Sequence, residues 1–199
     1  MTRRAILCAA LMLLLTTPAA GQGPGRLSED HEQRLAGGDI VVLDQLPPGG
    51  DVREGHGGTA MAFVRATPEA VWRLLVDYAG HAGLYPRVTD ARVLEAGGAR
   101  TVVRYVVGVG PFSFDFHVAN FPEPARGRLV WRLAHERPND LFRDTWGYWQ
   151  IVPRADGCIV TYAMAARTVL PAFLTRGAGR DGLVETLRAV RARAEGRTL

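Results

Sequence analysis

Apolar residues recur at helical spacing in the stretch that follows Thr67. Val71, Leu74, Leu75 and Tyr78 stand at positions i, i+3, i+4 and i+7, so they share one face of a helix. Thr67 is a residue type that caps helix N-termini well, because its hydroxyl accepts a hydrogen bond from a free backbone N–H. The pattern predicts an amphipathic helix from residue 67 to about residue 78.

After Val88 the apolar pattern changes to the two-residue period of β-strands and keeps it to about Arg167. Turn residues (Gly, Pro, Asn and Asp) separate the apolar runs at regular intervals. Regular strands joined by tight turns predict one antiparallel sheet in meander order, with a further strand before the helix. The predicted strands are 56–66, 91–96, 101–109, 111–121, 128–135, 143–152 and 158–167.

The C-terminal stretch returns to helical spacing. Leu183, Val184, Leu187 and Val190 form an apolar stripe, and Gly196 is placed to end the helix. The glycines at 177, 179 and 182 indicate that Pro171–Arg176 forms a separate turn or hinge before this helix. We expect the apolar stripe to pack on the concave face of the sheet.

The N-terminus has the pattern of an export signal. Arg3 and Arg4 precede an apolar run, Ala5–Leu15, and Ala19–Gly21 is a suitable cleavage site. The run is shorter than the ~20 residues that a membrane span needs. The pattern predicts a signal peptide over 1–21 and a periplasmic or secreted protein, and an uncleaved anchor is the alternative.

The remaining chain divides into an extension and one domain. Residues 22–55 form an N-terminal extension with a short helix predicted at Ser28–Ala36 and a strand at Ile40–Leu43. Residues 56–197 form the main domain, which is long enough to bury its own core.

The residues Val76, Asp77 and Tyr78, followed by Tyr85, Pro86 and Val88, form a V-D-Y…Y-P-x-V pattern. This pattern resembles the polyketide cyclase/dehydrase and coenzyme Q-binding branch of the START-like (helix-grip, SRPBCC) superfamily. The resemblance covers roughly residues 56–195. It implies an α+β fold in which an antiparallel sheet of about six to seven strands wraps around a long C-terminal helix and encloses a cavity. Asp77 corresponds to the Asp of the family's motif, and we expect it to make a structural hydrogen bond.

Composition removes several classes of function. All 24 basic residues are Arg, so no Lys can form a Schiff base, and the 20 acidic residues nearly balance them, which argues against a nucleic-acid partner. The five histidines show no metal-binding spacing, which argues against a zinc site. Neither Ser28 nor Ser113 lies in a G-x-S-x-G motif, so the nucleophile of an α/β-hydrolase is absent. Cys158 is the one cysteine left after cleavage of the signal. We therefore expect neither a metal nor a cofactor.

Strand alternation suggests where a ligand would bind. Phe114 and Phe116 share one face of a predicted strand, and the next two strands bring one Trp each to the same side. The tyrosine of the Tyr85-Pro86 turn would lie near the mouth of such a pocket. Packing of the core alone is the alternative explanation for these aromatic residues. Arg104 is a further candidate because an Arg in a pocket could bind a headgroup or a carboxylate, and exposure to solvent is the alternative for this side chain. The candidate pocket residues are Tyr85, Arg104, Phe114, Phe116, Trp131 and Trp149.

Three functions compete at this point. The pattern favours non-catalytic binding or transport of a hydrophobic small molecule, such as a lipid, an isoprenoid quinone or an aromatic compound. A cyclase/dehydrase-type enzyme would need a buried acid/base pair, and His117 with Asp115 is the pair that the sequence offers. A periplasmic interaction module is the third. Its last helix could contact anionic lipid transiently through Arg188, Arg191, Arg193 and Arg197, and a solvated helix face is the alternative, because Asp181, Glu185 and Glu195 dilute the positive charge.

Overall fold

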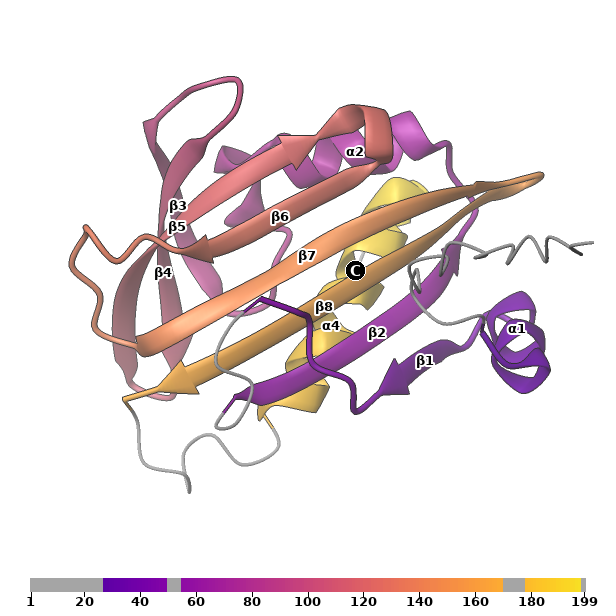
Figure 1. Ribbon diagram of the computed structural model, residues 1–199, viewed down its shortest axis with the longest axis horizontal. Coiled ribbons are helices and arrows are strands. Elements are labelled where there is room, and N and C mark those ends of the chain that lie inside the picture. The colour runs from indigo at the N-terminus through magenta and orange to yellow at the C-terminus, as the bar shows by residue number, and fades with distance from the viewer. Residues whose placement is uncertain (1–26, 50–54, 170–177, 198–199) are drawn as a thin grey trace, which may run out of the picture.

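The fold is one eight-stranded antiparallel sheet curved around a C-terminal helix, a START-like helix-grip arrangement (Figure 1). The computed structural model describes residues 27–49, 55–169 and 178–197. The strands follow the order β1-β2-β8-β7-β6-β5-β4-β3 across the sheet. Their bounds are β1 Ile40–Leu43, β2 His56–Val64, β3 Val88–Glu95, β4 Thr101–Val109, β5 Phe112–Glu123, β6 Arg128–Leu133, β7 Phe142–Arg154 and β8 Gly157–Thr168.

The sheet has one strand more than the six to seven expected. Strands β3 to β8 form the predicted meander, and β2 adds to its far side by pairing with β8. The additional edge strand is β1, which the sequence predicted as a strand but which we assigned to the extension. It pairs with β2 in the register Ile40↔Ala62, so the extension contributes to the same sheet.

The helix after Thr67 forms as predicted but is shorter. Helix α2 spans Pro68–Val76, and the Thr67 hydroxyl accepts a hydrogen bond from the Ala70 N–H at 3.2 Å. The helix ends at Asp77 because the chain turns into a 3-10 helix, η1 (Ala79–His81). The Asp77 carboxylate accepts from the Gly80 N–H at 3.3 Å, which is the structural hydrogen bond expected of this residue.

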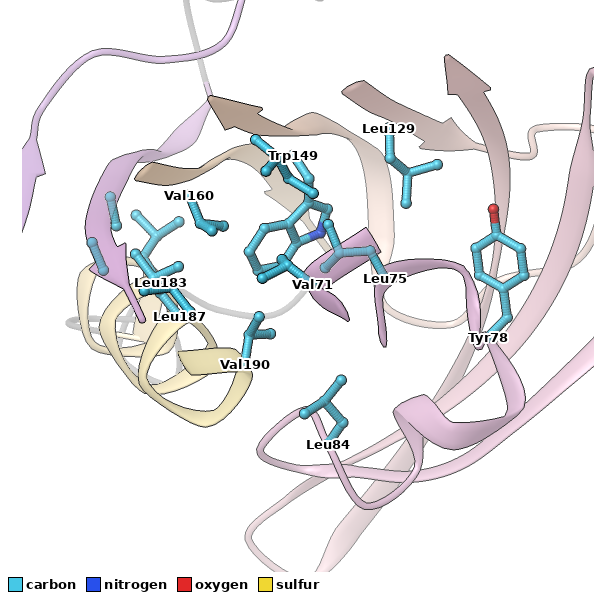
Figure 2. Close-up of a cluster of buried hydrophobic side chains, with 14 of the residues drawn as sticks. Val71, Leu75, Tyr78, Leu84, Leu129, Trp149, Val160, Leu183, Leu187 and Val190 are labelled. Carbon is cyan, nitrogen blue, oxygen red and sulfur yellow. The ribbon is translucent and has the colours of Figure 1, made fainter. Parts of the chain in front are cut away.

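Helix α4 (Ala178–Ala194) packs on the concave face of the sheet, as the apolar stripe predicted. Leu183, Leu187 and Val190 are fully buried, and Figure 2 shows them pointing from α4 toward Trp149 and Val160. Helix α2 lies on the same side of the sheet (Figure 1). These side chains join both helices and the sheet in one hydrophobic core.

The end of α4 is a Schellman motif at the predicted glycine. Gly196 has a φ of 68°, its N–H bonds the Arg193 carbonyl at 3.2 Å, and the Arg197 N–H bonds the Ala192 carbonyl at 2.8 Å. The predicted turn at Pro171–Arg176 lies outside the described residues.

The N-terminal extension covers part of the convex face of the sheet, over β1, β2 and β7. Helix α1 (Glu29–Ala36) packs Leu35 against β1 and β2. The chain after β1 then crosses in front of the sheet (Figure 1), where the Trp146 indole N–H donates to the Pro47 carbonyl at 3.0 Å. This cover explains why β7 carries a large apolar side chain, Trp146, on its convex face as well.

Two further observations concern the predicted signal peptide and possible membrane-spanning helices. The predicted signal peptide, 1–21, lies outside the described residues. Within 27–49, 55–169 and 178–197, no helix is both long and apolar enough to cross a bilayer.

Candidate functional site

A cavity of about 250 Å³ lies between the concave face of the sheet and helix α4. Its walls are the concave face of strands β4 to β8, the turn between η1 and β3, and one face of α4. The residues that line it are His81, Tyr85, Pro86, Arg87, Val88, Tyr105, Val107, Gly108, Phe116, Val118, Asn120, Leu129, Trp131, Phe142, Thr145, Trp149, Tyr162, Met164, Gly182 and Thr186.

Four of the six candidate pocket residues line this cavity. Phe116, Trp131 and Trp149 face it from three adjacent strands, and Tyr85 faces it from the turn before β3. Phe114 lies on the same face of β5 but beyond the lining residues, where its ring is 6.5 Å from that of Phe112.

The sixth candidate, Arg104, is corrected by the structure. It lies on the convex face, where its Nε donates to the Asp115 carboxylate at 2.8 Å and its Nη1 approaches Asp90 at 3.3 Å. The neighbouring Tyr105 faces the cavity instead, because successive side chains on a strand point to opposite faces. Burying a guanidinium in this apolar cavity without a partner would also be costly.

Seven aromatic rings surround the cavity in a continuous series, which we call the aromatic belt. Each ring contacts the next, with centroids between 4.1 Å and 6.2 Å apart. Such a belt offers flat apolar surface from several directions to a molecule held between its members. In order, the belt consists of Tyr162, Trp149, Tyr85, His81, Tyr105, Phe116 and Phe142.

The polar atoms of the belt are uncharged at neutral pH. His81 is 2 % exposed, and its Nδ1 lies 2.8 Å from the Tyr105 hydroxyl. Burial lowers the pKa of His81 to about 4, against the smaller opposing influence of the Leu74 and Leu75 carbonyls. Burial also raises the pKa of Tyr105 above its ordinary value. The interior of the cavity therefore presents hydrogen-bonding groups without a net charge.

The buried His81 predicts a pH-dependent stability. Between pH 6.5 and about 4 the unfolded chain binds a proton that the folded His81 does not, so stability falls as the pH falls through this window. From pH 7 to pH 4.5 the loss should be roughly 2–3 kcal/mol. Urea unfolding of the parent and of His81→Gln at both pH values measures it. The variant should lose less stability than the parent on acidification. An equal loss in both would mean that His81 is not the source of the pH dependence.

The acid/base pair considered for catalysis does not face the cavity. His117 lies on the convex face with its Nδ1 2.6 Å from the Pro138 carbonyl oxygen, and Asp115 is engaged by Arg104. No carboxylate lines the cavity among the described residues. Nor does any group of three or more His, Cys, Asp or Glu side chains come together for a metal ion in that part of the chain.

Several lining residues were not found from the sequence. Tyr105 and Tyr162 could have been found, because strand alternation places each of them on the inner face of its strand. His81 carries no such signal, because it lies in a 3-10 turn with glycines on both sides. Its role depends on tertiary contact with β4, which local pattern does not encode.

A protein-family comparison agrees with this geometry. The family model described as "Polyketide cyclase / dehydrase and lipid transport" matches residues 58–195. The chain belongs to this family. The matched residues contain α2, the strands β3 to β8, α4 and all but the first two residues of β2, so they include every wall of the cavity. No curated protein matches this chain in sequence.

The solved structures with a related fold include an aromatase/cyclase and a lipid transfer protein, so both activities in the family description are represented. The Zhui aromatase/cyclase from a Streptomyces species is 17% identical, covering 79% of this chain and 94% of its own, with a TM-score of 0.62. A STAR-related lipid transfer protein from Xanthomonas axonopodis is 18% identical, covering 78% and 98%, with a TM-score of 0.60. A START superfamily protein from Mycobacterium smegmatis is 16% identical, covering 69% and 96%, with a TM-score of 0.59. At these identities the likeness establishes the fold.

Proposed function

We propose that this family member binds or carries a hydrophobic small molecule in the cavity without changing it chemically. The observation that carries the proposal is the aromatic belt around a space in which Arg87, half-exposed, is the one charged side chain among the described lining residues. A cavity of 150 Å³ already accommodates benzene, so about 250 Å³ suits a molecule of two or so fused rings or a short chain. An aromatic group that buries ~200 Å² gains roughly 5 kcal/mol.

The competing functions have less support. The enzyme hypothesis loses its acid/base pair, because His117 and Asp115 point away from the cavity. Membrane contact through the last helix has weaker support as well, because Arg191 donates to the Gly38 carbonyl at 2.7 Å and Arg197 pairs with Glu195. Two of the four arginines in question are thus engaged within the protein.

The place of action is part of the same proposal. The N-terminal export pattern supports a carrier in the periplasm or outside the cell. A carrier there would move or hold an apolar compound that water dissolves poorly. This part rests on the sequence of residues 1–21 alone.

Trp131→Ala is the variant that tests binding most cleanly. Trp131 lines the cavity and is half-buried, whereas Trp149 is buried in the core and its loss would also destabilise the fold. Truncation should weaken binding of N-phenylnaphthylamine, an uncharged dye that fluoresces in apolar sites, by about tenfold or more. Fluorescence titration measures the affinity, and urea unfolding measures the stability.

Trp72→Ala is the matched control. Trp72 is also half-buried and packs on the core, but it lies on α2 and does not line the cavity. It should lose stability to a similar extent and keep its affinity for the dye. If both variants bind the dye as the parent does, Trp131 serves packing alone and the proposed binding site is wrong.

A further inference from the structure

One charged side chain reaches the cavity among its described lining residues, and it lies at the mouth. Arg87 is half-exposed there, in the turn that leads into β3. Its Nη2 lies 3.7 Å from the Glu185 carboxylate on α4, which is longer than a hydrogen bond. The guanidinium therefore keeps most of its five N–H donors free for another acceptor.

The backbone of Arg87 is also unusual. Its φ of 69° is the one positive value at a non-glycine residue within the described ranges. The conformation is held from both sides, since the Gly108 N–H donates to the Arg87 carbonyl at 2.9 Å and the Val88 N–H to the Tyr85 carbonyl at 3.1 Å. Glycine or Asn would take this conformation more easily, and strained residues of this kind gather at ligand sites. A long cationic side chain at such a position indicates that the side chain itself contacts a ligand.

We propose that the natural ligand is an amphipathic organic anion, and this inference rests on the proposed function. The apolar body lies within the aromatic belt, and the acidic group, a carboxylate or a phosphate, is bound by Arg87 at the mouth. A planar guanidinium matches such groups with two parallel hydrogen bonds. The bound anion takes the place of Glu185 beside Arg87.

The distribution of charge gives the ligand its orientation. The belt interior holds neutral groups, of which His81 and Tyr105 bond each other, so a charge placed there would be buried without a counter-charge. At the mouth, Arg87 and Glu185 are each about half-exposed, so an anion bound there keeps part of its hydration. The ligand therefore enters apolar end first and leaves its acidic group at the rim.

Three ligands with one two-ring body test the inference: naphthol, naphthoate and naphthyl phosphate. Isothermal titration calorimetry at pH 7 compares their affinities, and naphthol is the uncharged reference. In the parent, at least one anion should bind about tenfold or more tightly than naphthol. In Arg87→Gln the ratio of anion to naphthol affinity should fall by about the same factor. In Glu185→Gln the ratio should rise, because the competing carboxylate is gone.

Arg132→Gln is the matched control, since Arg132 is exposed on β6 and points away from the cavity. It removes the same charge and should leave the ratio unchanged. Preference for naphthoate or for naphthyl phosphate identifies the acidic group, and either result supports the inference. Equal affinity of all three ligands, or a ratio that Arg87→Gln leaves unaltered, overturns it and leaves the proposed function standing. Failure of all three ligands and of N-phenylnaphthylamine to bind overturns the proposed function itself.

Discussion

Replacing Gly182 with Phe is expected to abolish binding of apolar ligands while the protein stays folded. Gly182 lines the cavity from α4, and a Cβ built there meets no atom within 4 Å. Thr186, one helical turn later, also lines the cavity, so a larger side chain at 182 points into the same space. A phenyl group would fill much of the ~250 Å³ that the ligand needs. We expect affinity for N-phenylnaphthylamine to fall by about a hundredfold or more.

Gly182→Ala separates the filling of the cavity from the change in the helix. Alanine should stabilise α4 by up to about 1 kcal/mol relative to glycine, and its methyl group leaves most of the cavity open. Its affinity for the dye should stay near that of the parent. If Gly182→Phe is folded and binds the dye as the parent does, ligands bind somewhere other than this cavity.

Replacing Leu187 with Asp should have the largest effect on stability. Leu187 is 0% exposed and packs with Leu183 and Val190 between α4 and the sheet. The change removes a buried apolar side chain and places an unpaired carboxylate in the core. The combined cost should be at least about 4 kcal/mol, which is a large part of the stability of a typical domain. Urea unfolding followed by tryptophan fluorescence measures the loss.

Arg188→Ala provides the control on the same helix, because Arg188 is the next residue and is exposed. Its stability should lie within about 0.5 kcal/mol of the parent's. A Leu187→Asp variant as stable as the parent would mean that α4 is not docked in the grip, and the cavity would then lack one of its walls.

The helices and most strands could be predicted because their signals are local. The spacing of Val71, Leu75 and Tyr78 marks the apolar side of α2, and all three are buried. Leu183 and Leu187 likewise identify the buried face of α4 before any contact is known. Turn residues between apolar runs gave the strand order, since neighbouring strands in a meander are also neighbours in sequence.

Contacts between distant segments were harder to predict. Ile40–Leu43 was predicted as a strand, but local pattern does not say that it pairs with β2 across an intervening loop. The same applies to Pro47, which covers Trp146 although the two residues are 99 positions apart. This contact places the extension over the convex side of β7.

The candidate site could be predicted only in part from the sequence. Strand alternation placed Phe116, Trp131 and Trp149 correctly, since each faces inward from its own strand. Applied to β4, the same rule would have assigned Tyr105 to the cavity and Arg104 to the opposite face. Arg104 was chosen because its guanidinium could bind an acidic group, but the structure places it on the convex face.

Native mass spectrometry of the protein purified from its own host is the most direct test of a ligand-filled cavity. The parent should carry one small molecule with an apolar body per chain, released on gentle activation. Gly182→Phe, prepared in the same way, should show the mass of the bare chain. A parent without any bound molecule, together with no affinity for N-phenylnaphthylamine, would contradict the proposal that the cavity is a binding site.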